Sequence, residues 1–306
     1  MKYIKPYENL PELSQVALGC MRIADMTDAE LDTYINTALE SSINLFDHAD
    51  IYGRGRCEEV FGKALARDKS LRDKMVIQTK CSIVPGKMYD FSKEHIISSV
   101  DGSLKRLGVE HIDILLLHRP DLLMEPEEVA EAFDKLEKAG KVGNFGVSNH
   151  SPMQIELLKK YVKQPLKINQ MRLSIANATM VSCGANVNLC NDDGINYDGY
   201  LRDYCRLNEI TIQPWSPLQQ GFIKSCFLNE EKFSDINKTL AELGEKYGLT
   251  PAGMAIAWLL RLPEKTQPIV GTTKPDRVKA VAAAADVRIS REDWYRIYRE
   301  QGYPLP

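Results

Sequence analysis

Short apolar segments alternate with longer amphipathic ones along almost the whole chain. Eight apolar segments end in a polar or small residue: 16–19, 43–47, 75–80, 112–118, 145–148, 166–170, 210–215 and 268–271. Their length and their content of Val, Ile and Leu predict buried strands. Because a segment with helical character follows each of them, the pattern favours a parallel sheet covered by helices.

Boundary residues place several of the expected helices. Ser, Thr and Pro are typical of the first positions of a helix, and Gly is typical of the position after the last one. These signals predict helices over 28–41 after Thr27, over 92–107 before Gly108, over 126–139 before Gly140, and from Ser151-Pro152 and Thr250-Pro251 onward.

A closed (β/α)8 TIM barrel that spans residues 1–306 as a single domain is the fold that we expect at this length. A doubly wound open sheet is the alternative, but the Gly-x-Gly-x-x-Gly turn expected after one of its early strands does not occur. Two stretches interrupt the alternation. Residues 176–199 are rich in Asn, Gly and Asp, which predicts a long functional or poorly ordered loop, and residues 225–248 add charged helical sequence.

Composition narrows the class of protein. The net charge of −3 gives no indication of a nucleic-acid partner, and no segment is apolar and long enough to cross a membrane. The first residues contain no apolar run, so we expect no signal peptide. The seven cysteines are odd in number and form no Cys-x-x-Cys pair, which favours reduced thiols and a cytoplasmic protein.

Four residues at or just after strand ends have complementary chemistry: Asp47, Tyr52, Lys80 and His118. In a TIM barrel such strand ends meet on one face, where active sites are built. A tyrosine with a pKa near ~10 is a poor acid or base at neutral pH, and we expect the Lys80 ammonium to lower that pKa. Asp47 would keep Lys80 charged, and His118 would orient a substrate oxygen or assist the proton transfer.

Each of these residues also has a purely structural interpretation. Lys80 fits a buried ion pair, His118 a core histidine, and Tyr52 a packed loop. His48 and Asp50 form a His-x-Asp pair that fits a metal site, but that interpretation leaves Lys80 and Tyr52 without roles. The occurrence of complementary groups at successive strand ends favours catalysis.

The chain resembles the aldo-keto reductases, and within that family the bacterial branch of YdhF-like oxidoreductases. The resemblance rests on segments that follow one another through most of the chain: 46–53 with Asp47 and Tyr52, 77–80 with Lys80, 115–118 with His118, 146–149, 169–170, 215–218, and 269–274 with Arg277. It implies a nicotinamide cofactor bound in an extended form across the barrel mouth, without a Rossmann domain.

The resemblance also implies which residues bind that cofactor. Ser148, Asn149 and Gln170 match the positions that bind the nicotinamide carboxamide, and their amides and hydroxyl are suited to a primary amide. Trp215 matches the aromatic residue on which the nicotinamide stacks, and Ser216 and Leu218 match the loop at the pyrophosphate. The remaining residues that we expect at the cofactor are Gly19, Met21, Asp47, Thr272, Lys274 and Arg277.

Lys274 and Arg277 bear on the choice between NADPH and NADH. With Thr273 as the expected cap, both cations fall at the start of the last barrel helix, where they oppose the helix dipole. An anion between them, such as the 2′-phosphate of NADPH, fits this arrangement, and NADH stays the alternative. Ala280 and Val281 stand where many members have an acidic residue and an Asn for adenine, and His48 stands where a small hydroxyl residue is common.

These features predict NADPH-dependent reduction of a small-molecule aldehyde or ketone, with the proton from Tyr52. The alternative is a cofactor-binding regulatory or sensor protein on the same barrel, with little turnover. The expected substrate-lining segments are 21–23, 83–91, 119–123 and the long stretch 176–199.

Overall fold

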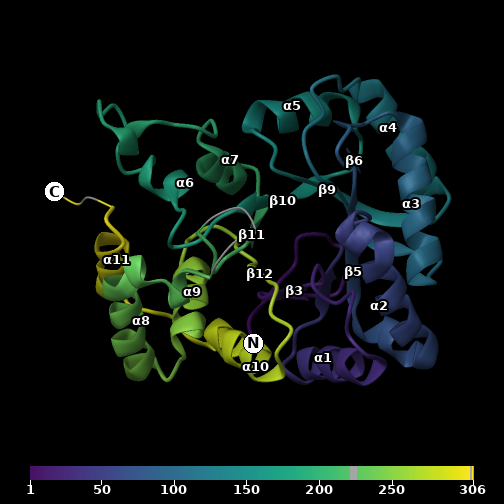
Figure 1. Cartoon of the computed structure of the whole chain (residues 1–306). Helices are drawn as coiled ribbons and strands as arrows, with labels where there is room; N and C mark the ends of the chain where they lie inside the picture. The colour runs from purple at the N-terminus through teal and green to yellow at the C-terminus, as the bar shows by residue number, and fades with distance from the viewer. Residues whose placement is uncertain (221–225, 304, 306) are drawn as a thin grey trace.

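A closed parallel barrel forms the centre of the molecule and confirms the expected fold. The computed structural model describes residues 1–220, 226–303 and 305. Neighbouring strands follow the order β10-β11-β12-β3-β4-β5-β8-β9 around the barrel, with the helices outside it (Figure 1). The barrel strands are β3 (Ala17–Gly19), β4 (Leu45–Asp47), β5 (Val76–Cys81), β8 (Ile112–Leu117), β9 (Val142–Ser148), β10 (Leu166–Arg172), β11 (Thr211–Trp215) and β12 (Ile269–Val270). Each expected strand overlaps one of them.

Helices alternate with the strands along the chain. The α-helices are α1 (Asp28–Glu40), α2 (Arg56–Arg67), α3 (Lys93–Leu107), α4 (Pro126–Lys138), α5 (Pro152–Tyr161), α6 (Thr179–Ser182), α7 (Leu201–Leu207), α8 (Ser234–Tyr247), α9 (Pro251–Leu260), α10 (Pro275–Ala282) and α11 (Arg291–Glu300). Short 3-10 turns are η1 (Tyr52–Gly55), η2 (Lys69–Lys74), η3 (Asp192–Gly194), η4 (Phe227–Asn229), η5 (Glu231–Phe233) and η6 (Ala283–Asp286). Among the described residues, no helix is long and apolar enough to cross a membrane.

The boundary signals act in the structure as expected. Thr27 caps α1, and Glu30 bonds back to the Thr27 amide to complete a capping box. Ser92, Ser151 and Thr250 each accept a hydrogen bond from the third residue of their helix. After α3 and α4 the chain reverses at glycines 108 and 140, with φ of 65° and 70°, the left-handed conformation that glycine adopts without strain.

The strands are buried on both faces. In β8, Leu115 and Leu117 belong to the core between the barrel and the helices, whereas Ile114 and Leu116 fill the barrel interior. This division follows from the alternation of side chains along a strand. The barrel interior below the carboxyl ends of the strands is therefore largely apolar, although buried amides such as those of Gln213 and Gln267 also lie in it.

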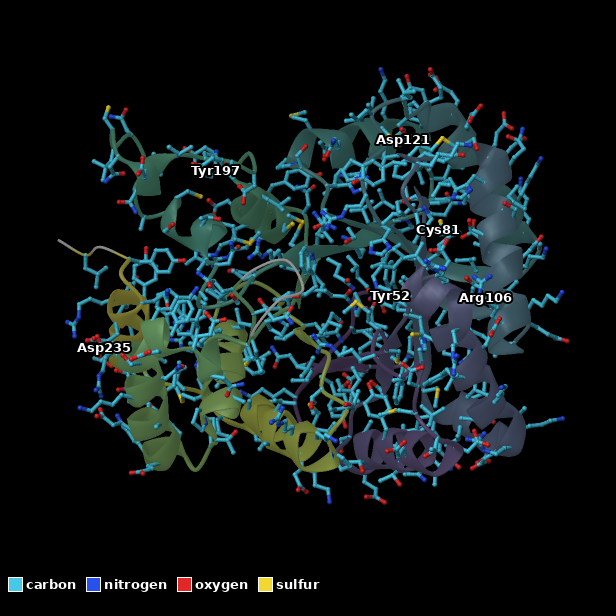
Figure 2. All side chains as sticks on the ribbon, in the orientation of Figure 1. Tyr52, Cys81, Arg106, Asp121, Tyr197 and Asp235 are labelled. Carbon is cyan, nitrogen blue, oxygen red and sulfur yellow. The ribbon has the colours of Figure 1, made fainter. Side chains whose placement is uncertain are left out.

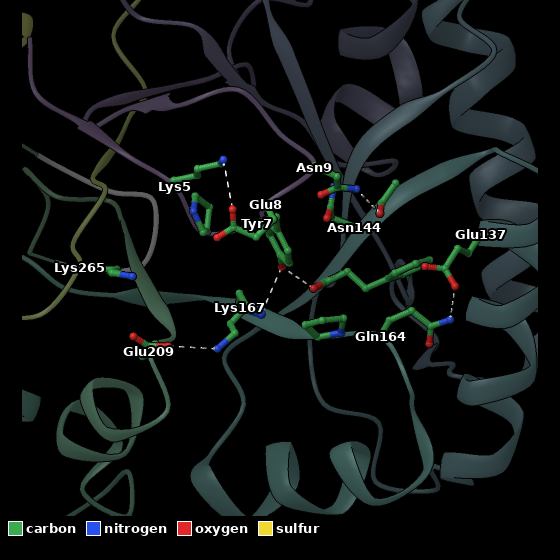
Figure 3. Close-up of a pocket in the computed structure, with 14 residues that line it drawn as sticks. Lys5, Tyr7, Glu8, Asn9, Glu137, Asn144, Gln164, Lys167, Glu209 and Lys265 are labelled. Carbon is green, nitrogen blue, oxygen red and sulfur yellow. Dashed lines mark hydrogen bonds and ion pairs between the residues drawn. The ribbon is translucent and has the colours of Figure 1, made fainter.

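An N-terminal hairpin, which the sequence pattern did not predict, closes the other end of the barrel. It consists of β1 (Tyr3–Ile4) and β2 (Leu13–Ser14), and Tyr7 between them packs against the interior core. The register of β9 and β10 shifts between Leu166 and Asn169. The Tyr7 hydroxyl accepts a hydrogen bond from the Lys167 amide (3.2 Å) and donates one to the Phe145 carbonyl, so it bridges the shift (Figure 3).

The expected loop over 176–199 contains helical structure of its own, namely α6 and η3. It runs from the end of β10 to α7, and Tyr197 within it is 73% exposed (Figure 2). The stretch 225–248 contains α8 as expected; Ser225 lies outside the described residues.

Candidate active site

A cleft of about 680 Å³ opens at the carboxyl ends of the strands. Its lining includes three of the four expected catalytic residues and every expected cofactor residue: Asp47, Tyr52, His118, Gly19, Met21, Ser148, Asn149, Gln170, Trp215, Ser216, Leu218, Thr272, Lys274 and Arg277. The remaining one, Lys80, is completely buried behind the wall of the cleft. Residues far apart in the sequence therefore converge on one site, because parallel strands end on the same face.

Lys80 is the centre of the buried polar cluster. Its Nζ donates hydrogen bonds to Oδ2 of Asp47 (2.7 Å), to the carbonyl of His48 (2.7 Å) and to the Tyr52 hydroxyl (3.2 Å). The two charged residues belong to the neighbouring strands β4 and β5, and Tyr52 begins the 3-10 turn that follows β4. Figure 2 places Tyr52 near the middle of the molecule.

The electrostatics of this cluster agree with one expectation and differ from another. Burial pushes the pKa of Lys80 down, but the charge of Asp47, together with Tyr52, outweighs it, so the pKa is raised and the ammonium is kept. Burial also raises the pKa of Tyr52, and the opposing effect of Lys80 does not reverse that direction. The expectation that Lys80 leaves Tyr52 with a lowered pKa is therefore wrong for the protein without ligand. At neutral pH Tyr52 is protonated.

His118 lies beside Tyr52, with its ring edge-on and the two centroids 6.1 Å apart. Burial, followed by the charges of Lys80 and Arg119, holds the pKa of His118 well below its ordinary value. The imidazole is therefore neutral at pH 7. A neutral imidazole has one nitrogen that donates and one that accepts, so it can orient a polar ligand without adding charge.

Hydrogen bonds fix the opposite wall of the cleft. Asn149 donates to Oγ of Ser148 (2.7 Å) and to the carbonyl of His118 (3.2 Å), and it accepts from the Trp215 indole (3.1 Å). Oγ of Ser148 donates to the carbonyl of Gln170 (2.9 Å). Asn149 has a φ of 61°, a left-handed conformation that Asn tolerates better than most residues. The Trp215 ring is thus oriented before any ligand arrives.

The basic pair lies at the beginning of α10, but the expected cap is wrong. α10 starts at Pro275, and Lys274 is the N-cap residue without a capping side chain. Thr272, not Thr273, makes the local hydrogen bond, accepting from the Lys274 amide (3.3 Å). Pro275 sets the start because its ring favours the first helical position and restricts the residue before it. Lys274 and Arg277 are both exposed.

The His-x-Asp pair does not face the cleft. His48 is fully buried with its ring edge-on to Phe61, at a centroid distance of 4.5 Å, and burial lowers its pKa to about 3. Among the described residues, no group of three or more His, Cys, Asp or Glu side chains is arranged to bind a metal ion.

The expected substrate-lining segments contribute unequally. Met21, Arg22, Ile83 and Arg119 line the cleft, but none of the described side chains of residues 176–199 does. The Arg119 guanidinium lies 5.6 Å from the centre of the Trp215 ring. Arg22 donates to the carbonyl of Gly271 (2.9 Å), which links the ends of the strands β3 and β12.

Sequence reasoning missed the buried glutamines beneath the cleft. Gln78 donates to Oδ1 of Asp47 (2.6 Å), and Gln213 bonds to both Gln78 and Gln170. A signal for them was present. Gln78 lies two residues before Lys80, and Gln213 two before Trp215, so strand alternation places each on the face of a site residue.

Known proteins with similar sequences identify the family to which this chain belongs. A family model described as the aldo/keto reductase family matches residues 15–299. Oxidoreductase YdhF of Escherichia coli is 34% identical, with 97% of this chain and 96% of the relative covered. The uncharacterized oxidoreductase YcsN of Bacillus subtilis is 36% identical, with 100% of each chain covered.

Two further matches extend the comparison. A 6-dehydroglucose reductase of Agrobacterium fabrum is 34% identical, with 94% of each chain covered. The crystal structure of a thermostable aldo-keto reductase with the inhibitor epalrestat has a TM-score of 0.76 at 23% identity, covering 98% of this chain and 100% of that one, and so has the same fold. The expected resemblance is confirmed: the chain is an oxidoreductase and belongs to the aldo/keto reductase family.

Proposed function

We propose that the protein uses NADPH to reduce an aldehyde or ketone to an alcohol, with Tyr52 as the proton donor. The observation that carries this proposal is the contact between Lys80 Nζ and the Tyr52 hydroxyl, 3.2 Å long, at the wall of the cleft. Lys80 is fully buried, and Tyr52 lines the cleft. A proton donor that faces the substrate and is supported from behind by a fixed cation suits a reaction in which oxygen gains negative charge.

The residues of the cleft fit a nicotinamide cofactor. Ser148, Asn149 and Gln170 all line the cleft and are linked to one another by hydrogen bonds, so they would bind the carboxamide. The fixed Trp215 ring would lie against the nicotinamide, and Lys274 and Arg277 would bind the 2′-phosphate at the start of α10. When bound, NADPH supplies the hydride.

The proton has a defined origin in this proposal. The raised pKa of Tyr52 keeps the phenol protonated at neutral pH, ready to donate to the carbonyl oxygen. Lys80 stabilises the phenolate that remains, and Asp47 balances the charge of Lys80. Neutral His118 would donate one hydrogen bond to the substrate oxygen and so set its angle.

A polar carbonyl compound is the substrate class to test first. Besides Arg277, the cleft contains two guanidinium groups, Arg22 and Arg119, and a guanidinium presents several fixed donors to hydroxyl or carboxylate oxygens. The Agrobacterium fabrum relative is named a reductase of 6-dehydroglucose, a sugar that carries a carbonyl group. We therefore infer that sugar-like aldehydes bind better than purely apolar ones of the same size.

The test is NADPH oxidation with a panel of sugar aldehydes, aromatic aldehydes and ketones. Tyr52→Phe should lower kcat by about 100-fold or more, the range found for loss of a general acid. Tyr197→Phe, at an exposed residue outside the cleft, is the matched control and should keep full activity. NADPH binding without turnover on the whole panel would instead favour the alternative of a cofactor-binding regulatory protein.

A further inference from the structure

Four buried glutamines form a continuous chain of hydrogen bonds through the barrel. Gln78 comes from β5, Gln170 from β10, Gln213 from β11, and Gln267 from the segment just before β12, and none is more than 2% exposed. Buried amides are costly unless they are hydrogen-bonded, and the interior of a TIM barrel is dominated by branched apolar residues. Four amides at this place therefore call for a physical reason.

The glutamine chain ends at the Ser14 carbonyl on one side and at the Asp47 carboxylate on the other. Both of these groups accept hydrogen bonds, and this orients every amide between them. At the lower end, Nε2 of Gln267 donates to the carbonyl of Ser14 (2.6 Å), so its Oε1 accepts from Nε2 of Gln213 (2.9 Å). Oε1 of Gln213 consequently faces upward. It accepts from Nε2 of Gln78 (2.9 Å) and from Nε2 of Gln170 (3.1 Å).

The same two amide groups meet the carboxylate of Asp47. Nε2 of Gln78 donates to Oδ1 of Asp47 at 2.6 Å, and Nε2 of Gln170 donates to the same oxygen at 3.0 Å. The other oxygen, Oδ2, accepts from Lys80 at 2.7 Å. Oδ1 thus binds the two amides and Oδ2 binds Lys80, so the carboxylate cannot rotate without breaking several hydrogen bonds.

We propose that Gln78 and Gln213 are positioning residues, which hold the carboxylate of Asp47 with its Oδ2 directed at Lys80. A buried network in which every polar group is hydrogen-bonded holds its members in one arrangement. Among the described residues that line the cleft, neither Gln78 nor Gln213 occurs. They therefore act through Asp47 and Lys80, and not by touching substrate or cofactor.

A matched control exists elsewhere in the fold. Gln164 is also buried, and its Nε2 donates to two carboxylates, Asp134 (3.0 Å) and Glu137 (2.8 Å), and Figure 3 shows the second of these bonds. Replacing it removes the same kind of bonds far from Asp47. Gln164→Met thus reproduces the loss of stability expected for Gln78→Met without disturbing the chain of glutamines.

The direct test is nitrogen NMR of labelled lysine side chains, which follows the ammonium of Lys80 in the protein without ligand. Lys80→Met identifies the signal. The charge of Asp47 raises the pKa of Lys80, so in Gln78→Met, where Asp47 is less well held, the Lys80 titration should move to lower pH by about one unit. Gln213→Met should move it in the same direction by less, and it replaces Gln78→Met if that variant does not fold. Titration as in wild type and Gln164→Met would overturn the inference.

The second readout rests on the proposed function. Gln78→Met should lower kcat about tenfold and leave the KM for NADPH within about twofold. An equal loss of kcat in Gln164→Met would mean that lower stability alone accounts for the effect, and it would contradict a positioning role. If the wild type has no turnover, the proposed function fails, and the NMR titration still decides the role of the glutamines.

Discussion

At the scale of single residues, Tyr52 is governed by two opposing effects. Burial disfavours the phenolate, and Lys80 favours it, and burial is the larger. Tyr52 therefore carries the proton that carbonyl reduction needs, whereas the reverse reaction, alcohol oxidation, requires its phenolate. We therefore predict a kcat for reduction that is level through neutral pH, and a kcat for oxidation that still rises near pH ~10.

Steady-state rates in both directions between pH 6 and 10.5 check this prediction, where the range is chosen to pass the ordinary tyrosine pKa of ~10. Oxidation that reaches its plateau near neutral pH would contradict a raised pKa for Tyr52. Tyr197→Phe again provides the comparison, because its exposed hydroxyl lies outside the cleft.

Asp50 predicts a pH dependence of stability. Burial, then the charge of Glu58, raises its pKa to about 7, only partly opposed by Arg106, and Oδ1 has no hydrogen-bond partner among the residues that the structure describes. Because this pKa is raised on folding, the folded state binds the extra proton. Stability therefore falls as pH rises from about 4 to about 7 and is level above that range.

Asp50→Asn should remove this loss. At pH 8 we expect the variant to be more stable than wild type by roughly 1–2 kcal/mol, with no gain near pH ~4. The gain is smaller than the free energy that corresponds to the full pKa shift, because the carboxyl is partly exposed. Urea unfolding at several pH values measures it. Asp73→Asn, at an exposed carboxylate, serves as the control, and a gain that does not depend on pH would refute the assignment.

At the scale of secondary-structure elements, the start of α10 decides the choice between NADPH and NADH. Arg277→Ala should weaken NADPH binding by about tenfold or more and change NADH binding little, since only NADPH carries the 2′-phosphate. Lys279→Ala on the same helix is exposed but does not line the cleft, so it should affect neither cofactor. Titration of both cofactors measures the difference, and equal losses for Arg277→Ala would refute the 2′-phosphate site.

The N-terminal hairpin carries a second prediction at this scale. A shifted register leaves the Lys167 amide without a strand partner, and the Tyr7 hydroxyl supplies one. Tyr7→Phe should lower the free energy of unfolding by about 1–3 kcal/mol without changing kcat, because the active site lies at the other end of the barrel. Tyr3→Phe in the same hairpin, 45% exposed, should change neither. A drop in kcat with unaltered stability would contradict this role.

At the scale of the whole molecule, local signals along the chain determined the barrel. All eight strands, the caps at Thr27, Ser92, Ser151 and Thr250, and the convergence of Asp47, Tyr52 and Lys80 follow from them. The reason is physical: apolar runs and capping residues act within a few positions, and a parallel barrel then brings strand ends together. The roles of the site residues, the choice of NADPH and the single-domain organisation stay predictions.

Other properties depend on contacts between residues far apart in the sequence, and only the tertiary structure decided them. The hairpin with Tyr7 packs against strands more than a hundred residues away. The raised pKa of Tyr52 reflects how deeply the folded chain buries it, and the glutamine chain depends on amide orientations set from both ends of the barrel. The burial of a side chain and the register of a strand depend on contacts throughout the fold, and for that reason no local pattern specifies them.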